Sequence, residues 1–174
     1  MNAKLVKIVS LAEEQFLLKR NDCLNSRLKI DTNIYYVEQG ALVLYVLDDQ
    51  GQKQVIRLAY KENFIVFLDA FFMGKPSCIH IEAIKQTKLK VIKKTDLNRY
   101  LEQNLIYNQV WLEFLEELLV QQLEREIDLL TSSAVVRYSR VLKRSPQLFQ
   151  EIPNKYIANY LRMSPETLSR LKKS

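Results

Sequence analysis

The sequence is poor in the residues that build metal centres and disulfide frameworks. Its 174 residues include one histidine, His80, and two cysteines, Cys23 and Cys78. A structural zinc site takes four ligands and an iron–sulfur cluster usually takes four cysteines, so these three residues cannot supply either site. Two cysteines also cannot form a disulfide scaffold. We therefore expect no bound metal, no cofactor and two reduced thiols, as in a reducing cytoplasm.

Glycine, proline and long apolar runs are scarce as well. Three glycines and four prolines are too few for collagen or a Gly/Pro-rich low-complexity segment, and an apolar content of 48% excludes disorder. No run of about 18 uncharged apolar residues is present, so we expect no membrane span and no membrane partner. The apolar stretch near the N-terminus is interrupted by Glu13 and Glu14. A globular, cytoplasmic chain without an export signal is therefore expected.

The positive charge is concentrated at the C-terminal end. The 26 basic and 20 acidic residues give a net charge of +6. Residues 131–174 hold nine of the basic and two of the acidic residues, a net charge of +7 that leaves −1 for the first 130 residues. Such a basic end is typical of a chain whose last quarter binds a polyanion, because each neutralised phosphate releases a counterion. A solvated basic surface without a partner is the alternative.

The first half of the chain has the pattern of short β-strands. Segments rich in Ile, Val and Tyr are separated by turn residues and cover residues 34–37, 41–49, 53–60, 63–68, 78–84 and 88–94. In the fifth segment, apolar residues alternate with His80 and Glu82, which predicts that these two face away from the core. A hairpin turn is predicted at residues 48–51. The pattern indicates an antiparallel sandwich or barrel.

The second half is predicted to be helical. Thr95 is of the type that caps a helix, here one that begins at Asp96. From residue 105 to residue 130 the apolar period is about 3.6, which predicts one long helix of about 39 Å. One stripe of this helix, together with Trp111, is expected to pack on the β domain: Ile106, Val110, Phe114 and Leu118. A solvated flank is expected from Glu124, Arg125, Glu126 and Asp128.

A second stripe on the same helix predicts a dimer. Its six residues are spaced by three or four positions and share one side of the helix: Leu112, Leu115, Leu119, Leu123, Ile127 and Leu130. The helix is longer than a small sandwich needs for its own burial, so this stripe is expected to contact a second copy of the chain. A core helix of a monomer is the alternative.

The last 22 residues have the spacing of a helix-turn-helix motif. Residues 131–133 are predicted to cap a preceding helix that ends near Ser145. Two short helices then follow around a three-residue connection, with inner faces formed by Ile157, Ala158, Leu161, Leu168 and Leu171. The second helix has clear start signals in Ser164 as N-cap, Pro165 at the first position and Glu166 in the first turn.

The exposed residues of this motif are of the types that contact DNA bases and phosphates. The candidate DNA-binding residues are Lys155, Arg162, Ser164, Glu166, Thr167, Ser169, Arg170, Lys172 and Lys173. An ordinary solvent-exposed helix face is the alternative.

With these features the whole chain resembles the Crp/Fnr superfamily of bacterial transcription regulators. Residues 164–170, SPETLSR, are the most specific match, and residues 34–54 resemble the family's β-roll hairpins more weakly. The resemblance implies an α+β fold: an N-terminal antiparallel β jelly roll of the cyclic-nucleotide-binding type, a long dimerisation helix and a C-terminal all-α helix-turn-helix domain. It also implies that Glu166 and Arg170 read base edges.

Two positions of the motif depart from the family pattern. Pro165 replaces an arginine that often contacts DNA, so that contact is not expected here. Arg162 stands where helix-turn-helix motifs usually have glycine, at some cost if the backbone is left-handed.

The resemblance also bears on cyclic nucleotides. The family's phosphate cassette has a Gly-Glu pair and an Arg-Ser pair, and the aligned positions are Val66 and Phe67, and Ser77 and Cys78. A cyclic phosphate needs a cation to offset its desolvation, and Ser77 supplies none, while Phe67 lacks the carboxylate for the ribose. Lys75 is the only nearby cation. We therefore expect no response to cyclic AMP, and the four-cysteine and haem ligand sets of other members are not evident.

Three regions are predicted: residues 1–104 as a sensor domain, residues 105–131 as a dimerisation helix and residues 132–174 as a DNA-binding domain. The predicted function is a dimeric, sequence-specific transcription regulator that is not an enzyme. Double-stranded DNA and a second copy of the chain are the expected partners, RNA polymerase is a further candidate, and a small-molecule effector is either unidentified or lacking.

Two other functions compete with this prediction. One is a jelly-roll module that binds a ligand or protein and whose C-terminal helices are structural. The other is a cupin-like enzyme, which would need several histidines with a carboxylate, whereas His80 is alone.

Overall fold

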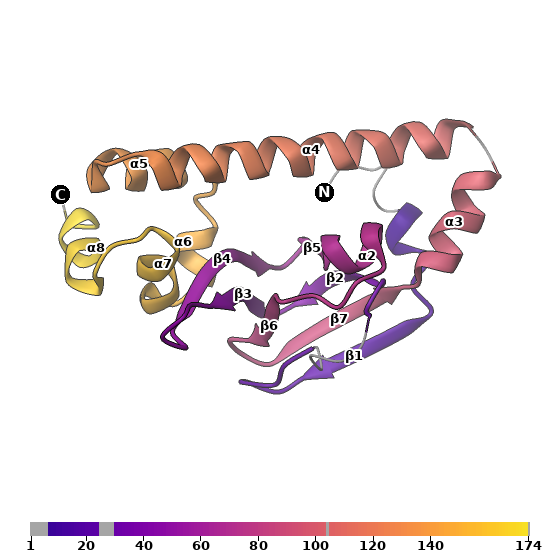
Figure 1. Ribbon diagram of the computed structural model, residues 1–174, viewed down its shortest axis with the longest axis horizontal. Helices are drawn as coiled ribbons and strands as arrows, with labels where there is room; N and C mark the ends of the chain where they lie inside the picture. Colours follow the sequence, from indigo (N-terminus) through magenta and orange to yellow (C-terminus); the bar gives the residue numbers. More distant parts are fainter. Residues whose placement is uncertain (1–6, 25–29, 104, 174) are drawn as a thin grey trace.

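The computed structural model describes residues 7–24, 30–103 and 105–173. A β-roll occupies the first part of the chain, a long helix runs across one side of it, and four short helices follow at one end (Figure 1). The fold is α+β, as the sequence predicted.

The β-roll consists of two antiparallel sheets. One has the order β1-β7-β2-β5, formed by Glu14–Leu18, Thr87–Ile92, Ile34–Gln39 and Phe64–Val66. The other has the order β4-β3-β6, formed by Lys53–Tyr60, Ala41–Leu47 and His80–Ala83. The side chains of Leu42, Ile81 and Leu89 are fully buried in one core cluster that draws on both sheets. Alternating side chains from two packed sheets form such a core.

Several predicted boundaries differ from the observed ones. Strand β1 was not among the predicted segments, and the strand predicted over residues 63–68 ends at Val66. A short helix, α2 (Leu68–Met73), follows it and ends at Gly74, whose φ of 64° is left-handed. Helix α3 (Lys94–Glu102) begins two residues before the predicted Asp96 and has Lys93, not Thr95, at its N-cap.

Glu82 does not face solvent as its alternation predicted. It is 8% exposed, accepts a hydrogen bond from the Tyr45 hydroxyl at 3.2 Å and pairs with the Lys53 ammonium group. His80 is half-buried, and its ring stacks on the Tyr45 ring with 5.1 Å between the ring centroids. The reason is the register: Glu82 and His80 lie opposite Val43 and Tyr45 of β3, which belong to a second hydrophobic cluster that also contains Ile157 and Leu168, so this face of the sheet is covered too.

The long helix α4 (Leu105–Leu130) has the predicted bounds. The side chains of Val110, Phe114 and Leu118 are buried against the β-roll. The ring centroids of Phe114 and Phe64 are 5.2 Å apart. Trp111 lies between Phe71 and Phe114, as predicted. Ile106 of the same predicted stripe is 67% exposed, so the packed face begins one turn later than expected.

The flank expected to be solvated is instead an ion-pair network. Asp128 is fully buried and accepts from the Arg140 Nε at 2.9 Å, and it also pairs with Arg144. Glu124 accepts from the same two arginines at 2.7 and 3.0 Å. Arg125 is 6% exposed, and only Glu126 lies in solvent. The prediction failed because α5 (Ala134–Arg144), which carries both arginines, packs across this end of α4.

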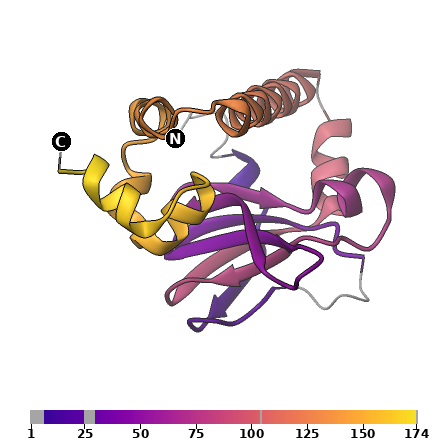
Figure 2. The same ribbon diagram turned by 60° about the vertical axis from the view of Figure 1, so that its left-hand side comes forward.

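The C-terminal helices pack directly on the three-stranded sheet. After α5, whose N-cap Ser133 accepts from the Val136 N–H as predicted, come α6 (Leu148–Glu151), α7 (Asn154–Tyr160) and α8 (Pro165–Leu171). Their buried residues share one hydrophobic cluster with Val43, Tyr45 and Val55 of β3 and β4. Figure 2 shows these helices lying against the end of the sheet.

Replacing Asp128 should strongly destabilise the protein. The Asp128→Ala substitution removes the fully buried carboxylate of this network and leaves Arg140 and Arg144 with Glu124 alone, a loss of about 2 kcal/mol in unfolding free energy, because hydrogen bonds between charged groups are lost. Urea unfolding measures it, with Glu126→Ala as the matched control that should change stability by no more than about 0.5 kcal/mol. Equal unfolding midpoints for the two variants would refute the role given to this network.

Candidate nucleic-acid interface

The predicted helix-turn-helix motif is present. Helices α7 and α8 are joined by a turn in which the Leu161 N–H donates to Ile157 and the Met163 N–H donates to the Ala158 carbonyl. Ala158 is buried, and its small side chain allows the two helices to approach closely. Arg162 has a φ of 53°, so the left-handed turn expected from the family pattern occurs at a residue with a Cβ atom.

The start of α8 has the predicted cap. The Ser164 hydroxyl accepts from the Thr167 N–H at 3.2 Å, and Pro165 occupies the first turn. The pKa of Glu166 is lowered, mainly by a hydrogen bond from its own backbone N–H and then by the Ser164 hydroxyl and the charge of Arg170. Glu166 therefore keeps its negative charge, which the helix N-terminus also favours.

The exposed side of α8 presents most of the predicted base-reading residues. Glu166, Ser169 and Arg170 are exposed, and Leu168 on the opposite side is fully buried. Thr167 is half-buried, and its hydroxyl lies 3.2 Å from that of Ser164. The structure thus places Ser164 and Thr167 in the cap, and it places Glu166 and Arg170 one turn apart on the open face.

The residues predicted to contact phosphates differ in whether their side chains already have a partner in the fold. Lys173 is exposed, and Lys155 lies over the Tyr156 ring at 4.7 Å. Lys172 donates to the Asn154 side chain at 2.6 Å. Arg162 donates to the side chain of Gln54 in β4, so in this arrangement it contacts the β-roll.

Arg137 was predicted only as part of the basic C-terminal end, but it has a structural role. It is 8% exposed, and its guanidinium donates to the carbonyl groups of Leu161 at 2.6 Å, Arg162 at 3.1 Å and Ser132 at 3.3 Å. It therefore fixes the turn of the motif to the start of α5. Its position four residues before the buried Val141, on the inner face of α5, was the available signal.

Helix α7 covers the free edge of β4. The Asn159 side chain accepts from the Val55 N–H at 2.8 Å and donates to the Lys53 carbonyl at 2.9 Å. The Arg125 guanidinium donates to the Val55 carbonyl at 3.2 Å. These side chains satisfy backbone groups that an edge strand would otherwise leave unpaired.

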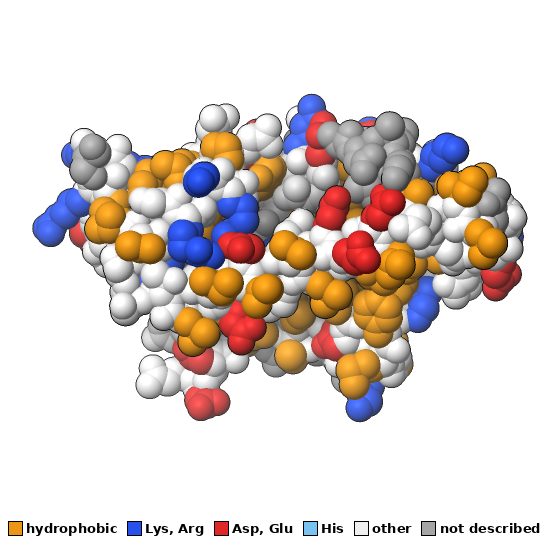
Figure 3. Space-filling model, turned by 90° about the horizontal axis from the view of Figure 1, so that it is seen from above, with side chains coloured by type: hydrophobic (Ala, Val, Ile, Leu, Met, Phe, Trp, Pro, Cys, Tyr) orange, Lys and Arg blue, Asp and Glu red, His pale blue; other side chains and the backbone are white. Residues whose placement is uncertain are grey.

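The predicted dimer stripe is uncovered in the single chain. Leu119, Leu123 and Leu130 are 70%, 56% and 79% exposed, and Leu115 is half-buried. Figure 3 shows hydrophobic side chains along this side of α4. An apolar band of this length is unusual for a surface that faces only water.

The position of the nucleotide cassette is apolar. Phe67 is buried and precedes α2, and the Ser77 hydroxyl accepts from the Ile79 N–H. A hollow of about 390 Å³ lies between the β-roll and α4. Apart from Arg57 and Gln122, its lining is aliphatic or aromatic: Leu44, Ile56, Ile65, Val66, Leu68, Phe72, Ile79, Leu115, Leu118 and Leu119.

Comparison with protein families gives a match to the cyclic nucleotide-binding domain over residues 15–104. The chain belongs to the cyclic nucleotide-binding domain family. Its overall fold is that of the Crp/Fnr regulators. A comparison of the sequence with curated proteins found no significant match.

Solved structures of three Crp/Fnr regulators are similar over nearly the whole chain. FixK2 from Bradyrhizobium japonicum is 18% identical with a TM-score of 0.73, covering 92% of this chain and 82% of that one. CLP, a c-di-GMP-responsive global regulator from Xanthomonas campestris, is 14% identical with a TM-score of 0.67, covering 99% and 90%. The catabolite activator protein of Thermus thermophilus is 16% identical with a TM-score of 0.59, covering 99% and 82%.

Over residues 7–24, 30–103 and 105–173, no group of three or more His, Cys, Asp or Glu residues could hold a metal ion. Cys23 and Cys78 are free and exposed. None of the helices in these ranges combines the length and the apolar character required to cross a membrane.

Proposed function

We propose that this protein is a dimeric, sequence-specific DNA-binding transcription regulator that works in the cytoplasm. The observation that carries the proposal is the capped helix α8, which exposes Glu166 and Arg170 next to a basic C-terminal end. A regulator of this kind binds DNA and a second copy of itself and performs no catalysis. RNA polymerase remains a further candidate partner.

The proposed readout assigns different roles to the exposed side chains. In the major groove, the Arg170 guanidinium would bind a guanine in bidentate fashion and the Glu166 carboxylate would accept from a cytosine amine. Ser169 is a further candidate for base contact. Lys155, Lys172 and Lys173 would contact phosphates and set the affinity for all sequences. Arg162 can join them only after leaving Gln54.

The proposed dimer places two such helices on one DNA face. The exposed stripe of α4 would form a parallel pair, and a two-fold axis would set the half-sites about one helical turn, roughly 34 Å, apart. Residues 1–104 would then be the sensor domain, residues 105–131 the dimerisation helix and residues 132–174 the DNA-binding domain.

A second candidate function is supported by the packing of the C-terminal helices. They share a hydrophobic cluster with β3 and β4, and Arg162 contacts Gln54. A jelly-roll module that binds a ligand or protein, with structural C-terminal helices, would have the same packing. Salt-dependent binding to duplex DNA distinguishes the regulator from this module.

The Arg170→Ala substitution tests the proposed readout. It should weaken binding to the preferred sequence by about 1 to 3 kcal/mol and flatten the preference at one position per half-site, because a bidentate pair to guanine is lost. Lys173→Ala is the matched control: it should weaken all sequences alike and reduce the salt slope by about 0.9. Selection from a randomised duplex pool measures both, and an unchanged preference in Arg170→Ala would refute base reading by α8.

The double substitution Leu119→Glu and Leu123→Glu should break the proposed dimer. Four carboxylates would then face each other across the apolar interface at a high desolvation cost. Sedimentation should give twice the 20.5 kDa chain mass for the wild type and for the exposed control Glu116→Gln, and the chain mass for the double variant. A wild-type monomer at micromolar concentration would contradict the dimer.

Cyclic AMP and cyclic GMP should not bind. The buried Phe67 offers no acceptor for the ribose hydroxyl, and Ser77 offers no charge for the cyclic phosphate. Titration calorimetry with millimolar nucleotide should therefore show no saturable heat. Saturable binding below 1 mM, which is about −4.1 kcal/mol, would show that another group supplies the missing charge.

A further inference from the structure

The turn between α7 and α8 is closed partly by its own backbone and partly by Arg137. The Arg162 N–H donates to the Asn159 carbonyl at 3.0 Å, and the Met163 N–H donates to the Ala158 carbonyl at 3.0 Å. This is the pattern of a Schellman motif, in which the left-handed residue is Arg162. The carbonyls of Leu161 and Arg162 lie beyond the two that the motif pairs, and they accept from Nε and Nη2 of Arg137 at 2.6 and 3.1 Å.

The same guanidinium also holds the chain that leaves the long helix. Helix α4 ends at Leu130, and Nη1 of Arg137 donates to the carbonyls of the next two residues, Thr131 and Ser132. One side chain therefore connects the end of α4 to the turn that ends at Ser164, the N-cap of α8. Only a planar guanidinium has enough donors in a fixed geometry for such a connection.

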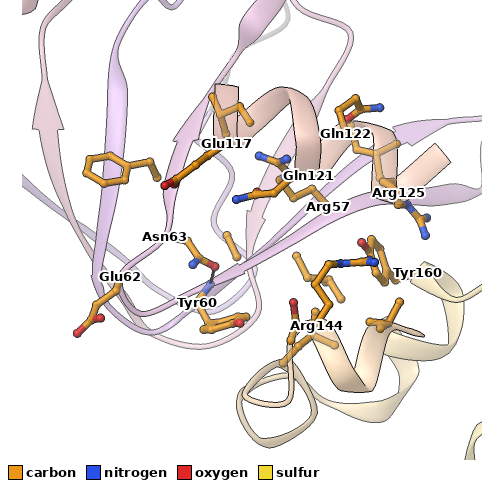
Figure 4. Close-up of a pocket in the computed structure, with 18 of the residues that line it drawn as sticks. Arg57, Tyr60, Glu62, Asn63, Glu117, Gln121, Gln122, Arg125, Arg144 and Tyr160 are labelled. Atoms are coloured by element: carbon orange, nitrogen blue, oxygen red, sulfur yellow. Dashed lines mark hydrogen bonds between the residues drawn. The ribbon is translucent and has the colours of Figure 1, made fainter. Parts of the chain in front are cut away.

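This connection is independent of the packing against the β-roll. All four acceptor carbonyls belong to the chain after α4 or to the turn after α7. By contrast, Asn159 bonds the backbone of β4, and Tyr160 lies against Arg125 of α4 with 3.8 Å between the guanidinium carbon and the ring centroid (Figure 4). The carbonyl of Arg162 stays available to Arg137 when the Arg162 side chain leaves Gln54, because the two are different groups.

The position of α8 relative to α4 matters if the chain is the dimeric DNA-binding regulator proposed above, and the present inference rests on that function. The paired α4 helices define the two-fold axis, so the direction that α8 takes from the end of α4 sets the distance between the two recognition helices. Each added base pair moves a half-site by about 3.4 Å and rotates it by about 34° around the duplex. A recognition helix that is held firmly can follow one spacing, whereas a loosely held helix can follow several.

We propose that this protein recognises pairs of half-sites at one fixed spacing and that Arg137 is the positioning residue that enforces this spacing. Arg137 is only 8% exposed and acts through the turn, without touching DNA. Its role is therefore separable from that of Arg170, which selects a base within each half-site. Loss of the Arg137 hydrogen bonds relaxes the spacing between half-sites and leaves the base preference inside them unchanged.

Binding of the full-length protein to duplexes with different spacings tests the proposal. Each duplex carries two inverted copies of the half-site that the wild type selects, at roughly 8 to 12 base pairs from centre to centre. We expect wild-type affinity to fall about tenfold, as for one mismatched base pair, at two base pairs from the best spacing, and to differ by less than about threefold across all spacings for Arg137→Gln. The ratio of two affinities measured on one protein sample does not depend on the fraction of folded protein.

Two further variants separate geometry from charge. Arg137→Lys keeps the positive charge but cannot reach four carbonyls, so it should also relax the spacing, to a smaller extent than Arg137→Gln. Lys143→Gln is the matched control: it removes one exposed positive charge from the same helix, and it should keep the wild-type spacing preference even if the affinity for all duplexes falls.

Each outcome decides the proposal. A relaxed spacing with an unchanged base preference supports it. Weakening by the same factor at every spacing would show a merely structural role for Arg137 and would overturn it, as would a changed base preference in Arg137→Gln. Wild-type binding without a preferred spacing would overturn this inference alone, whereas failure of the wild type to bind any duplex would overturn the proposed function and this inference with it.

Discussion

The position of the helix-turn-helix motif depends on how helix α7 meets the free edge of strand β4. Asn159 bonds the backbone of Lys53 and Val55, and Arg125 reaches the carbonyl of Val55 from α4. An edge strand has unpaired backbone groups that must find partners when buried. Here a side chain from the C-terminal helices supplies them. The contact between Arg162 and Gln54 follows from this docking, and so does a polar cavity of about 350 Å³ (Figure 4) that is lined by residues of β4, α4 and α7.

Three arginines of α5 then hold the surrounding elements in place. Arg137 ties the turn of the motif to α5, and Arg140 and Arg144 tie α5 to the acidic residues of α4. Three of the nine basic residues in the last 44 are therefore used inside the molecule. The remaining six are Lys143, Lys155, Arg162, Arg170, Lys172 and Lys173. The net charge of this end overstates the number of cations that a polyanion could meet, because charge counting ignores partners within the fold.

The parts of the fold that the sequence predicts well are those specified by neighbouring residues. The period of 3.6 gives both ends of α4, and Ser164 and Pro165 give the start of α8, because amphipathic periodicity and capping are local. Helix α2 was missed because FIVFLDAFF is apolar except for Asp69 and shows neither the period of two of a strand nor the period of 3.6 of a helix. Glu82 and Asp128 were misassigned because their partners are far along the chain: Tyr45 is 37 residues from Glu82, and Arg140 is 12 residues from Asp128.

Part of the candidate site could likewise be predicted from the sequence, and part could not. The exposed residues of α8 could be predicted, because a helix with one apolar side fixes which residues face outward. The polar cavity between β4, α4 and α7 could not, since Arg57, Arg125 and Tyr160 come from three elements that are far apart in the sequence. Only the docking of α7 on β4 brings them together.

Arg57 lies at the boundary between two chemically different spaces. Together with Ile56, Leu118 and Gln122 it lines both the apolar hollow under α4 and the polar cavity near α7. Apart from Arg57 and Gln122, the described residues that line the apolar hollow are aliphatic or aromatic. The lining of the polar cavity also includes Tyr160 of the helix-turn-helix motif. Because these four side chains are walls of both spaces, a substitution at any one of them changes the surroundings of the apolar hollow and of the polar cavity together.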